Sequence, residues 1–167
     1  MTENYLNERL AELEKRVDRL EAMQPPIEQK AWGNGIETTM LDCGLEIALE
    51  DYYEIDENGN KKTEFTFDEA QEIEKKTSGK WRVPTAKEWL KIVLELGTTE
   101  NGNLDRDNLV KELNLTEDED GCYGDYWSST VVSASQAYGL GFGSSGLYPA
   151  VQYGRYGGRS VRCVSAS

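Results

Sequence analysis

Residues 127–164 read WSSTVVSASQAYGLGFGSSGLYPAVQYGRYGGRSVRCV, and this C-terminal stretch contains the strongest indication of the fold. It contains no Asp, Glu, Lys or Asn, although charged residues make up 29% of the chain. Tyr138, Leu140 and Phe142 alternate in period two, which is typical of a β-strand with one face toward a core. Between residues 138 and 158 Gly, Tyr and Ser predominate, as in antibody paratopes. The stretch is therefore predicted to form strands that carry a binding surface.

The chain as a whole is acidic, with a net charge of -13 over 167 residues. At this length we expect one globular domain plus an appendage. Nucleic-acid binding requires a basic surface, so we expect no nucleic-acid partner. No apolar run has the length of a membrane span or the form of a signal peptide, so we expect no membrane insertion and synthesis in a cytoplasm.

The sequence contains few residues that suit catalysis or metal binding. His is absent, which removes the commonest general base and most zinc and iron sites. Cys43, Cys122 and Cys163 show no CxxC spacing, and either one bridge between Cys122 and Cys163 or buried free thiols fits them. The acidic runs at residues 56–61 and 117–120 favour a solvated turn and a solvated loop over calcium sites. We therefore expect no metal, no cofactor and no enzymatic activity.

Residues 2–23 carry a heptad pattern that predicts a coiled-coil helix over residues 1–24. Apolar residues recur at alternating spacings of four and three and form one seam: Leu6, Leu10, Leu13, Val17 and Leu20. Charged residues at the flanking positions form two pairs that suit a parallel assembly: Arg9 with Glu14 and Arg16 with Glu21. We expect a parallel homotrimer, with a dimer as the second choice. The alternative is one amphipathic helix that lies on the chain's own domain.

Thr2 is expected to cap this helix and Pro25-Pro26 to end it. Short strand signals follow from Ile27 to Tyr53, and Asn58-Gly59 predicts a hairpin turn. Further along the chain the pattern predicts helices over residues 67–76, residues 86–96 and residues 109–113. Together these elements indicate the α+β class.

The helix over residues 86–96 has the clearest local signals. Thr85 is predicted to be its N-cap, with Glu88 completing a capping box. The predicted apolar face comprises Trp89, Leu90, Val93 and Leu94.

Three motifs occur together: WRVPTAKEW at residues 81–89, YWSST at residues 126–130 and GRSVRCV at residues 158–164. In this combination residues 27–164 resemble C-type-lectin-fold domains, which include formylglycine-generating-enzyme-like domains and the variable proteins of diversity-generating retroelements. The resemblance implies that residues 25–167 form a C-type lectin fold, in which two helices pack on a small twisted antiparallel sheet. It also implies that the variable region spans about residues 127–164.

In the retroelement proteins, adenine-directed mutagenesis varies the C-terminal segment and does not readily produce Lys, Glu, Met or Trp, which fits the missing acids and lysines here. The implied invariant scaffold is Trp127, Ala137, Leu140, Phe142, Arg155, Gly158, Ser160, Val161, Arg162 and Cys163. The implied varied, solvent-facing and ligand-binding positions are Val131, Val132, Ser133, Ser135, Tyr138, Gly139, Gly141, Gly143, Leu147, Tyr148, Val151, Tyr153, Gly154, Tyr156 and Gly157. The alternative is a Gly-rich, turn-forming end of a β domain.

The resemblance implies a receptor-binding protein whose hypervariable surface recognises a protein or glycan on a host or neighbouring cell, and the heptad pattern predicts that it is presented as a trimer. Tyr138, Tyr148, Tyr153 and Tyr156 are the expected aromatic anchors. The expected location is a virion, at a phage tail-fibre tip made in the host cytoplasm, and the alternative is an adhesin on a bacterial cell surface. An enzyme of the formylglycine-generating type is a further alternative, but the cysteines do not show the reactive pair or copper-site arrangement of that class.

Overall fold

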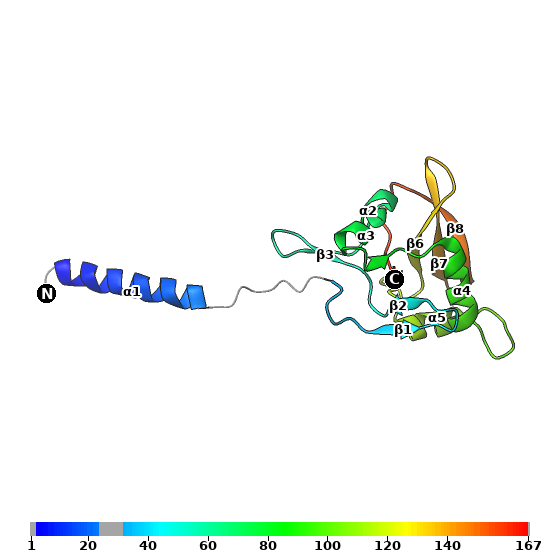
Figure 1. The fold of residues 1–167 in the computed structure, drawn as a ribbon, viewed down its shortest axis with the longest axis horizontal. Coiled ribbons are helices and arrows are strands. Elements are labelled where there is room, and N and C mark those ends of the chain that lie inside the picture. Colours follow the sequence, from blue (N-terminus) through cyan, green and yellow to red (C-terminus); the bar gives the residue numbers. More distant parts are fainter. Residues whose placement is uncertain (1–2, 24–31, 167) are drawn as a thin grey trace. The chain divides into compact units, whose positions relative to one another are not determined.

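The computed structural model describes residues 3–23 and 32–166, which fall into two units (Figure 1). Residues 1–31 belong to an N-terminal unit, and residues 32–167 belong to a globular unit. The predicted cap at Thr2 and the predicted helix stop at Pro25-Pro26 lie outside the described residues. Within the described ranges, no helix is both long enough and apolar enough to cross a membrane.

The N-terminal unit contains one helix, α1, over Glu3–Met23. The helix predicted from the heptad pattern is therefore present. All of its residues are exposed in the single chain. Its five seam side chains keep roughly half or more of their surface in solvent, from 49% for Leu13 to 63% for Leu20. Pairing of this helix with other copies remains a prediction.

The globular unit is α+β, with small antiparallel sheets (Figure 1). Its helices are α2 (Phe67–Gln71), α3 (Ile73–Lys76), α4 (Ala86–Leu96) and α5 (Arg106–Leu113). A four-stranded sheet has the order β1 (Thr38–Met40), β2 (Glu46–Ala48), β9 (Val164–Ser165) and β5 (Trp81–Arg82). A hairpin joins β3 (Glu54–Ile55) to β4 (Lys61–Lys62). The third sheet is the meander β6 (Gly124–Val131), β7 (Gln136–Gly143) and β8 (Gly146–Gly154).

The structure confirms the local signals at several element boundaries. Thr85 caps α4, its hydroxyl accepts from the Glu88 N–H at 3.1 Å, and the Glu88 carboxylate accepts from the Thr85 N–H at 2.9 Å. The Asn58-Gly59 turn joins β3 to β4, with Gly59 at a φ of 82°. The predicted helix over residues 67–76 divides into α2 and α3 at Glu72.

Two predictions for the helices of the globular unit need correction. The helix predicted at residues 109–113 begins earlier, at Arg106, because the Asp105 carboxylate caps it by accepting from the Asn108 N–H at 3.1 Å. In α4 the buried residues are Trp89, Ile92 and Val93, which lie three and four residues apart on one face. Leu90 and Leu94 were predicted to belong to the buried face, but they lie outside it and are 44% and 55% exposed.

The C-terminal end of the chain is less regular than predicted. The stretch over residues 127–164 was predicted to form strands, but at its end only Val164 belongs to a strand, β9, and Ser160 forms an isolated parallel bridge with Tyr126. All three cysteines are free, and Cys163 is buried, so the free-thiol alternative holds at that position. Burial raises the pKa of the Cys163 thiol.

The meander lies between two parts of the hydrophobic core. The α4-side core contains Tyr126, Leu140 and Phe142 from the meander, packed with residues of α4 and α5. The Trp127-side core contains Trp127 and Ala137, packed with aromatic residues such as Phe65 and Phe67. Successive strand residues point to opposite faces, so adjacent residues 126 and 127 join different cores. The period-two prediction that Leu140 and Phe142 are buried is confirmed.

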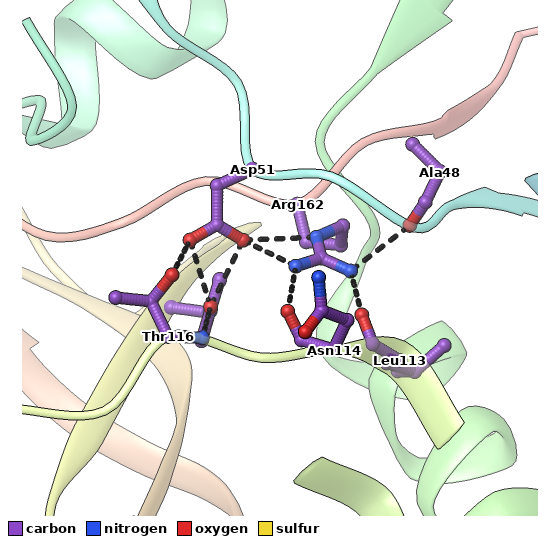
Figure 2. Close-up of polar contacts among 7 residues, drawn as sticks. Ala48, Asp51, Leu113, Asn114, Thr116 and Arg162 are labelled. Atoms are coloured by element: carbon purple, nitrogen blue, oxygen red, sulfur yellow. Dashed lines mark hydrogen bonds and ion pairs between the residues drawn. The ribbon is translucent and has the colours of Figure 1, made fainter. Parts of the chain in front are cut away.

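Arg162 is a buried cation whose donors join distant segments (Figure 2). Its Nε and Nη2 donate to Asp51 Oδ1 at 2.9 and 2.5 Å. Further donor contacts reach the carbonyl oxygens of Ala48 (3.1 Å), Leu113 and Asn114 (3.0 Å). The end of β2, the end of α5 and the segment before β9 are thus held by one side chain.

We expect Arg162→Met to lower the free energy of unfolding of the globular unit by about 3–5 kcal/mol, because the change leaves the Asp51 carboxylate and three carbonyls without their cation. Tryptophan fluorescence in a urea titration measures this unit alone, since Trp32, Trp81, Trp89 and Trp127 all belong to it.

Lys76→Met is the matched control. Lys76 pairs with Glu54 at 2.6 Å on the surface, and a surface pair contributes under about 1 kcal/mol. Arg162→Lys keeps the charge but supplies fewer donors, so we expect an intermediate loss. Equal losses for Arg162→Met and Lys76→Met would contradict the role of the buried network.

Candidate functional site

A pocket of about 420 Å³ lies over the meander, on the face that also carries Trp127. Asp125 shares that face with Trp127 because the two lie two positions apart along β6, and alternate residues of a strand point to the same face. The pocket is lined by Asp118, Tyr123, Gly124, Asp125, Gly141, Phe142, Gly143, Ser145, Tyr148, Val151 and Tyr153. Its walls therefore offer aromatic rings, hydroxyl groups and two carboxylates, which suits the binding of a polar ligand.

The positions of the Tyr123 and Tyr153 rings in the pocket wall depend on the missing side chains of β7 glycines. A Cβ atom on Gly139 would lie 2.4 Å from the carbonyl oxygen of Tyr126 and 2.9 Å from the Tyr153 ring. A Cβ atom on Gly141 would lie 2.4 Å from the Tyr153 hydroxyl, and one on Gly143 would lie 2.8 Å from the Tyr123 ring. The two tyrosine rings thus occupy the space that side chains at these positions would need.

The prediction that Gly139, Gly141 and Gly143 face solvent is therefore wrong, since all three are buried. Leu147 was also predicted to face solvent, but it is only 6% exposed and belongs to the α4-side core. At Gly139 the absence of a side chain is a packing requirement within β7, because a Cβ atom there would meet a main-chain oxygen of the neighbouring strand.

The Tyr153 ring packs against the β7 glycines, and the Arg159 guanidinium also packs on it. The Arg159 guanidinium carbon lies 3.9 Å from the Tyr153 ring centroid and 5.3 Å from that of Trp127. Arg159 Nη1 donates to Asp125 Oδ2 at 2.9 Å, so the cation is paired. Desolvation by burial, with a smaller contribution from the Asp125 charge, raises the pKa of Tyr153 to about 12. Tyr153 is therefore a neutral and immobilised wall of the pocket.

The Asp125 carboxyl is the half-buried acidic group of the wall. Burial raises its pKa, the neighbouring Glu64 charge acts in the same direction, and the Arg159 cation opposes both. Its charge is balanced by Arg159, so Asp125 serves mainly to position the cation behind Tyr153.

The rim of the pocket is formed by more exposed residues. Tyr123 is 55% exposed and Tyr148 is 47% exposed. The hydroxyl groups of Ser145 and Tyr148 lie 2.9 Å apart and hydrogen-bond to each other. Asp118 Oδ1 accepts from the N–H groups of Cys122 at 2.9 Å and Tyr123 at 3.1 Å. These two bonds hold the loop that carries Tyr123.

The hydrogen bonds from the Cys122 and Tyr123 backbone keep the pKa of the Asp118 carboxyl below its usual range. Asp118 is exposed and anionic at neutral pH. The prediction that residues 117–120 form a solvated loop is confirmed, since three of the four are exposed. Within the described part of the chain, no three acidic or Cys side chains are grouped so that they could hold a metal ion.

The structure divides the predicted ligand-binding positions into three groups. Five of them line the pocket: Gly141, Gly143, Tyr148, Val151 and Tyr153. Seven lie at the other end of the meander, around the β6–β7 turn and beyond β8: Val131, Val132, Ser133, Ser135, Gly154, Tyr156 and Gly157. Arg155 joins the two segments of this second group, because its N–H donates to the Ser135 carbonyl at 2.9 Å.

The remaining three predicted positions are Tyr138, Gly139 and Leu147. Tyr138 is half-buried and shares a strand face with Leu140 and Phe142, opposite the face of Tyr153. Tyr138 and Tyr153 therefore do not contribute to one continuous surface of the sheet. Among the implied scaffold residues, Trp127, Val161, Arg162 and Cys163 are buried, whereas Gly158 is exposed.

Four pocket residues were not predicted from the sequence: Asp118, Tyr123, Asp125 and Ser145. Three of them precede Trp127 and so lay outside the stretch considered variable. The signal available for Asp125 was period two: a strand through Trp127 places Asp125 on the same face. Asp118 and Tyr123 reach the pocket through a loop whose path depends on tertiary contacts.

Comparisons of the chain with protein-family models, with curated proteins and with solved structures found no match. The site is therefore interpreted from its residues and geometry.

We expect Gly139→Ala to lower the free energy of unfolding by about 1–3 kcal/mol, because the new methyl group meets a main-chain oxygen that cannot move independently of β6. Gly154→Ala is the matched control on β8, since a Cβ atom there meets nothing within 4 Å. We expect that variant to stay within about 0.5 kcal/mol of the parent protein. Urea titrations of both variants measure the difference, and equal stabilities would contradict the packing role of Gly139.

Proposed function

We propose that this chain is a receptor-binding protein that recognises a cell-surface ligand through the meander face and presents several copies of that face through α1. The observation that carries the proposal is the pocket of about 420 Å³ whose walls include Tyr123, Tyr148 and Tyr153. Its volume lies in the range typical of ligand sites, and aromatic anchors commonly dominate binding energy.

The architecture supports assignment to the C-type lectin fold suggested by the three sequence motifs. α2 contacts β6, and α4 contacts all three strands of the antiparallel meander. We propose on this basis that the globular unit is a C-type-lectin-fold domain of the kind found in variable proteins of diversity-generating retroelements. Fold alone does not assign a ligand, so the ligand is argued from the site.

In this proposal, variation between copies of the protein is confined to positions where a new side chain does not disturb the core. Val131 and Tyr156 meet this condition, being 52% and 81% exposed. Tyr148 meets it on the pocket rim. Gly139 and Leu147 do not, because one packs against a main-chain oxygen and the other lies in the α4-side core. The proposed variable set is therefore smaller than the resemblance implies.

We propose that α1 assembles as a parallel homotrimer. Its exposed seam and the flanking pairs of opposite charge support this assembly, because half-exposed Leu and Val side chains lose water contact when three helices pack. Three linked faces gain avidity through effective concentration, so that weak individual sites still hold a cell surface. We place the assembly at a phage tail-fibre tip, with a bacterial cell surface as the second location.

For the full chain we expect light scattering to give a mass three times the 18.8 kDa of one copy. Leu13→Glu places a charge in the middle of the seam, and we expect the mass of one copy for this variant. Lys15→Glu is the matched control, since Lys15 lies on the opposite side of the same helix and should leave the trimer intact. A single-copy mass for the parent chain would overturn the proposed assembly.

We expect the fluorescently labelled full chain to bind cells of some species in a panel of bacteria, as measured by flow cytometry. On the bound species, Tyr148→Ala should reduce the apparent affinity about tenfold or more, because it removes a rim anchor. Leu94→Ala is the control, because Leu94 is about as exposed as Tyr148, at 55% against 47%, but lies on α4, outside the residues that line the pocket. Binding that both variants retain in full would contradict the proposed surface.

A further inference from the structure

The pocket over the meander has walls that suit a cation. Tyr123 and Tyr148 are exposed residues of its lining, and Asp118 contributes an exposed carboxylate to the same lining. Among the described residues that line the pocket there is no Lys or Arg. The face of an aromatic ring attracts a cation, and a nearby carboxylate adds to that attraction.

An aromatic ring and a carboxylate already hold one of the protein's own cations, Arg159. The Arg159 guanidinium lies over the Tyr153 ring at 3.9 Å and pairs with Asp125 at 2.9 Å. Arg159 is not among the residues that line the pocket, and its charge is balanced by Asp125. A second protein cation, Arg106, acts electrostatically on Asp118, and it is paired with Glu117 at 2.9 Å. An incoming cation therefore meets the Tyr123 and Tyr148 rings and the Asp118 carboxylate, while both neighbouring arginines are paired with carboxylates.

We propose that the pocket binds a primary ammonium group on an alkyl stem, as presented by a lysine side chain of a surface protein. This inference rests on the proposed receptor-binding function and names the ligand class. A primary ammonium offers three N–H donors, and the rim offers acceptors in Asp118 and in the Ser145 and Tyr148 hydroxyl groups. A quaternary ammonium has no N–H donor and uses only the rings, so the polar rim favours lysine.

The direct test uses saturation-transfer NMR on the full chain with Nα-acetyl-lysine methylamide as the probe. The same compound acetylated on Nε is a neutral probe of similar shape. We expect a saturable response from the lysine probe and a response at least about threefold weaker from its acetylated form, because acetylation removes the charge. Equal responses from the two probes would overturn the inference.

Variants then assign the response to the pocket. Asp118→Asn retains an oxygen for the Cys122 and Tyr123 N–H groups but removes the charge, and we expect about two- to fivefold weaker binding of the lysine probe. Asp68→Asn is the matched control, since Asp68 is an exposed carboxylate on α2 outside the pocket lining. Tyr148→Phe keeps the ring but removes one hydroxyl acceptor, so we expect about two- to threefold weaker binding, whereas Tyr148→Leu removes both ring and hydroxyl and should weaken binding about fivefold or more. An unchanged Asp118→Asn variant would overturn the assignment.

Further outcomes separate this inference from the proposed function. Choline carries a quaternary ammonium, and a stronger response from choline than from the lysine probe would overturn the lysine assignment. A chain that binds bacterial cells but gives no response to the lysine probe would refute the ligand class and leave receptor binding in place. A chain that responds to the lysine probe as expected but binds no cell in the panel would support ammonium binding in the pocket and refute the proposed binding to a cell surface.

Discussion

The buried Arg162 guanidinium is the constraint on which the globular unit depends. It is fully buried, so both charges of the Arg162–Asp51 pair lose hydration on folding. The ion pair offsets this desolvation penalty only because carbonyl oxygens also accept hydrogen bonds from the remaining N–H groups of Arg162. The same Asp51 carboxylate accepts from the Tyr126 hydroxyl at 2.9 Å, and the Thr116 N–H donates to that hydroxyl at 2.7 Å. The network therefore extends from the C-terminal segment into β6, which is the first strand of the meander.

Core contacts hold the meander on both faces, and the exposed side chains of its rim lie outside those contacts. Trp127 Nε1 donates to the Phe65 carbonyl at 2.6 Å, and Trp89 Nε1 donates to the Trp127 carbonyl at 3.0 Å. Two indoles thus anchor one strand position from opposite sides of the sheet. A rigid support allows exposed residues such as Tyr148 and Tyr156 to change with little effect on folding, because their side chains contribute little to either core.

The features that the sequence predicted well are those set by near neighbours. Two such features are the capping box of Thr85 and Glu88 and the turn at Asn58-Gly59. Each involves residues only a few positions apart, so a short segment of sequence is enough to predict it. The burial of Leu140 and Phe142 followed from period two alone. The α4 face was predicted incorrectly because the apolar residues between Trp89 and Leu96 offer two possible stripes, and the choice between them depends on what packs against the helix.

The candidate site was harder to predict because its geometry comes from contacts between distant residues. Alternation correctly placed Gly139 and Gly141 opposite Leu140, but it did not reveal that Tyr153, from the next strand, covers them. Asp51 gave no sequence signal of its role, since its partner Arg162 lies 111 residues away. Contacts at that separation are fixed only by the assembled fold.

The packing of Tyr153 on the β7 glycines also limits how the pocket can diversify. A side chain at Gly141 would first meet the Tyr153 hydroxyl, which is the far end of a side chain and able to move, whereas one at Gly139 would meet the main chain of β6. A larger residue at position 141 is therefore compatible with the fold when position 153 becomes smaller, and the two positions are coupled. Position 139 has no such compensation, because no change of side chain removes the Tyr126 carbonyl oxygen. Substitutions at the rim are thus compatible with the fold. A larger residue at position 141 requires a smaller one at position 153, and packing excludes any side chain at position 139.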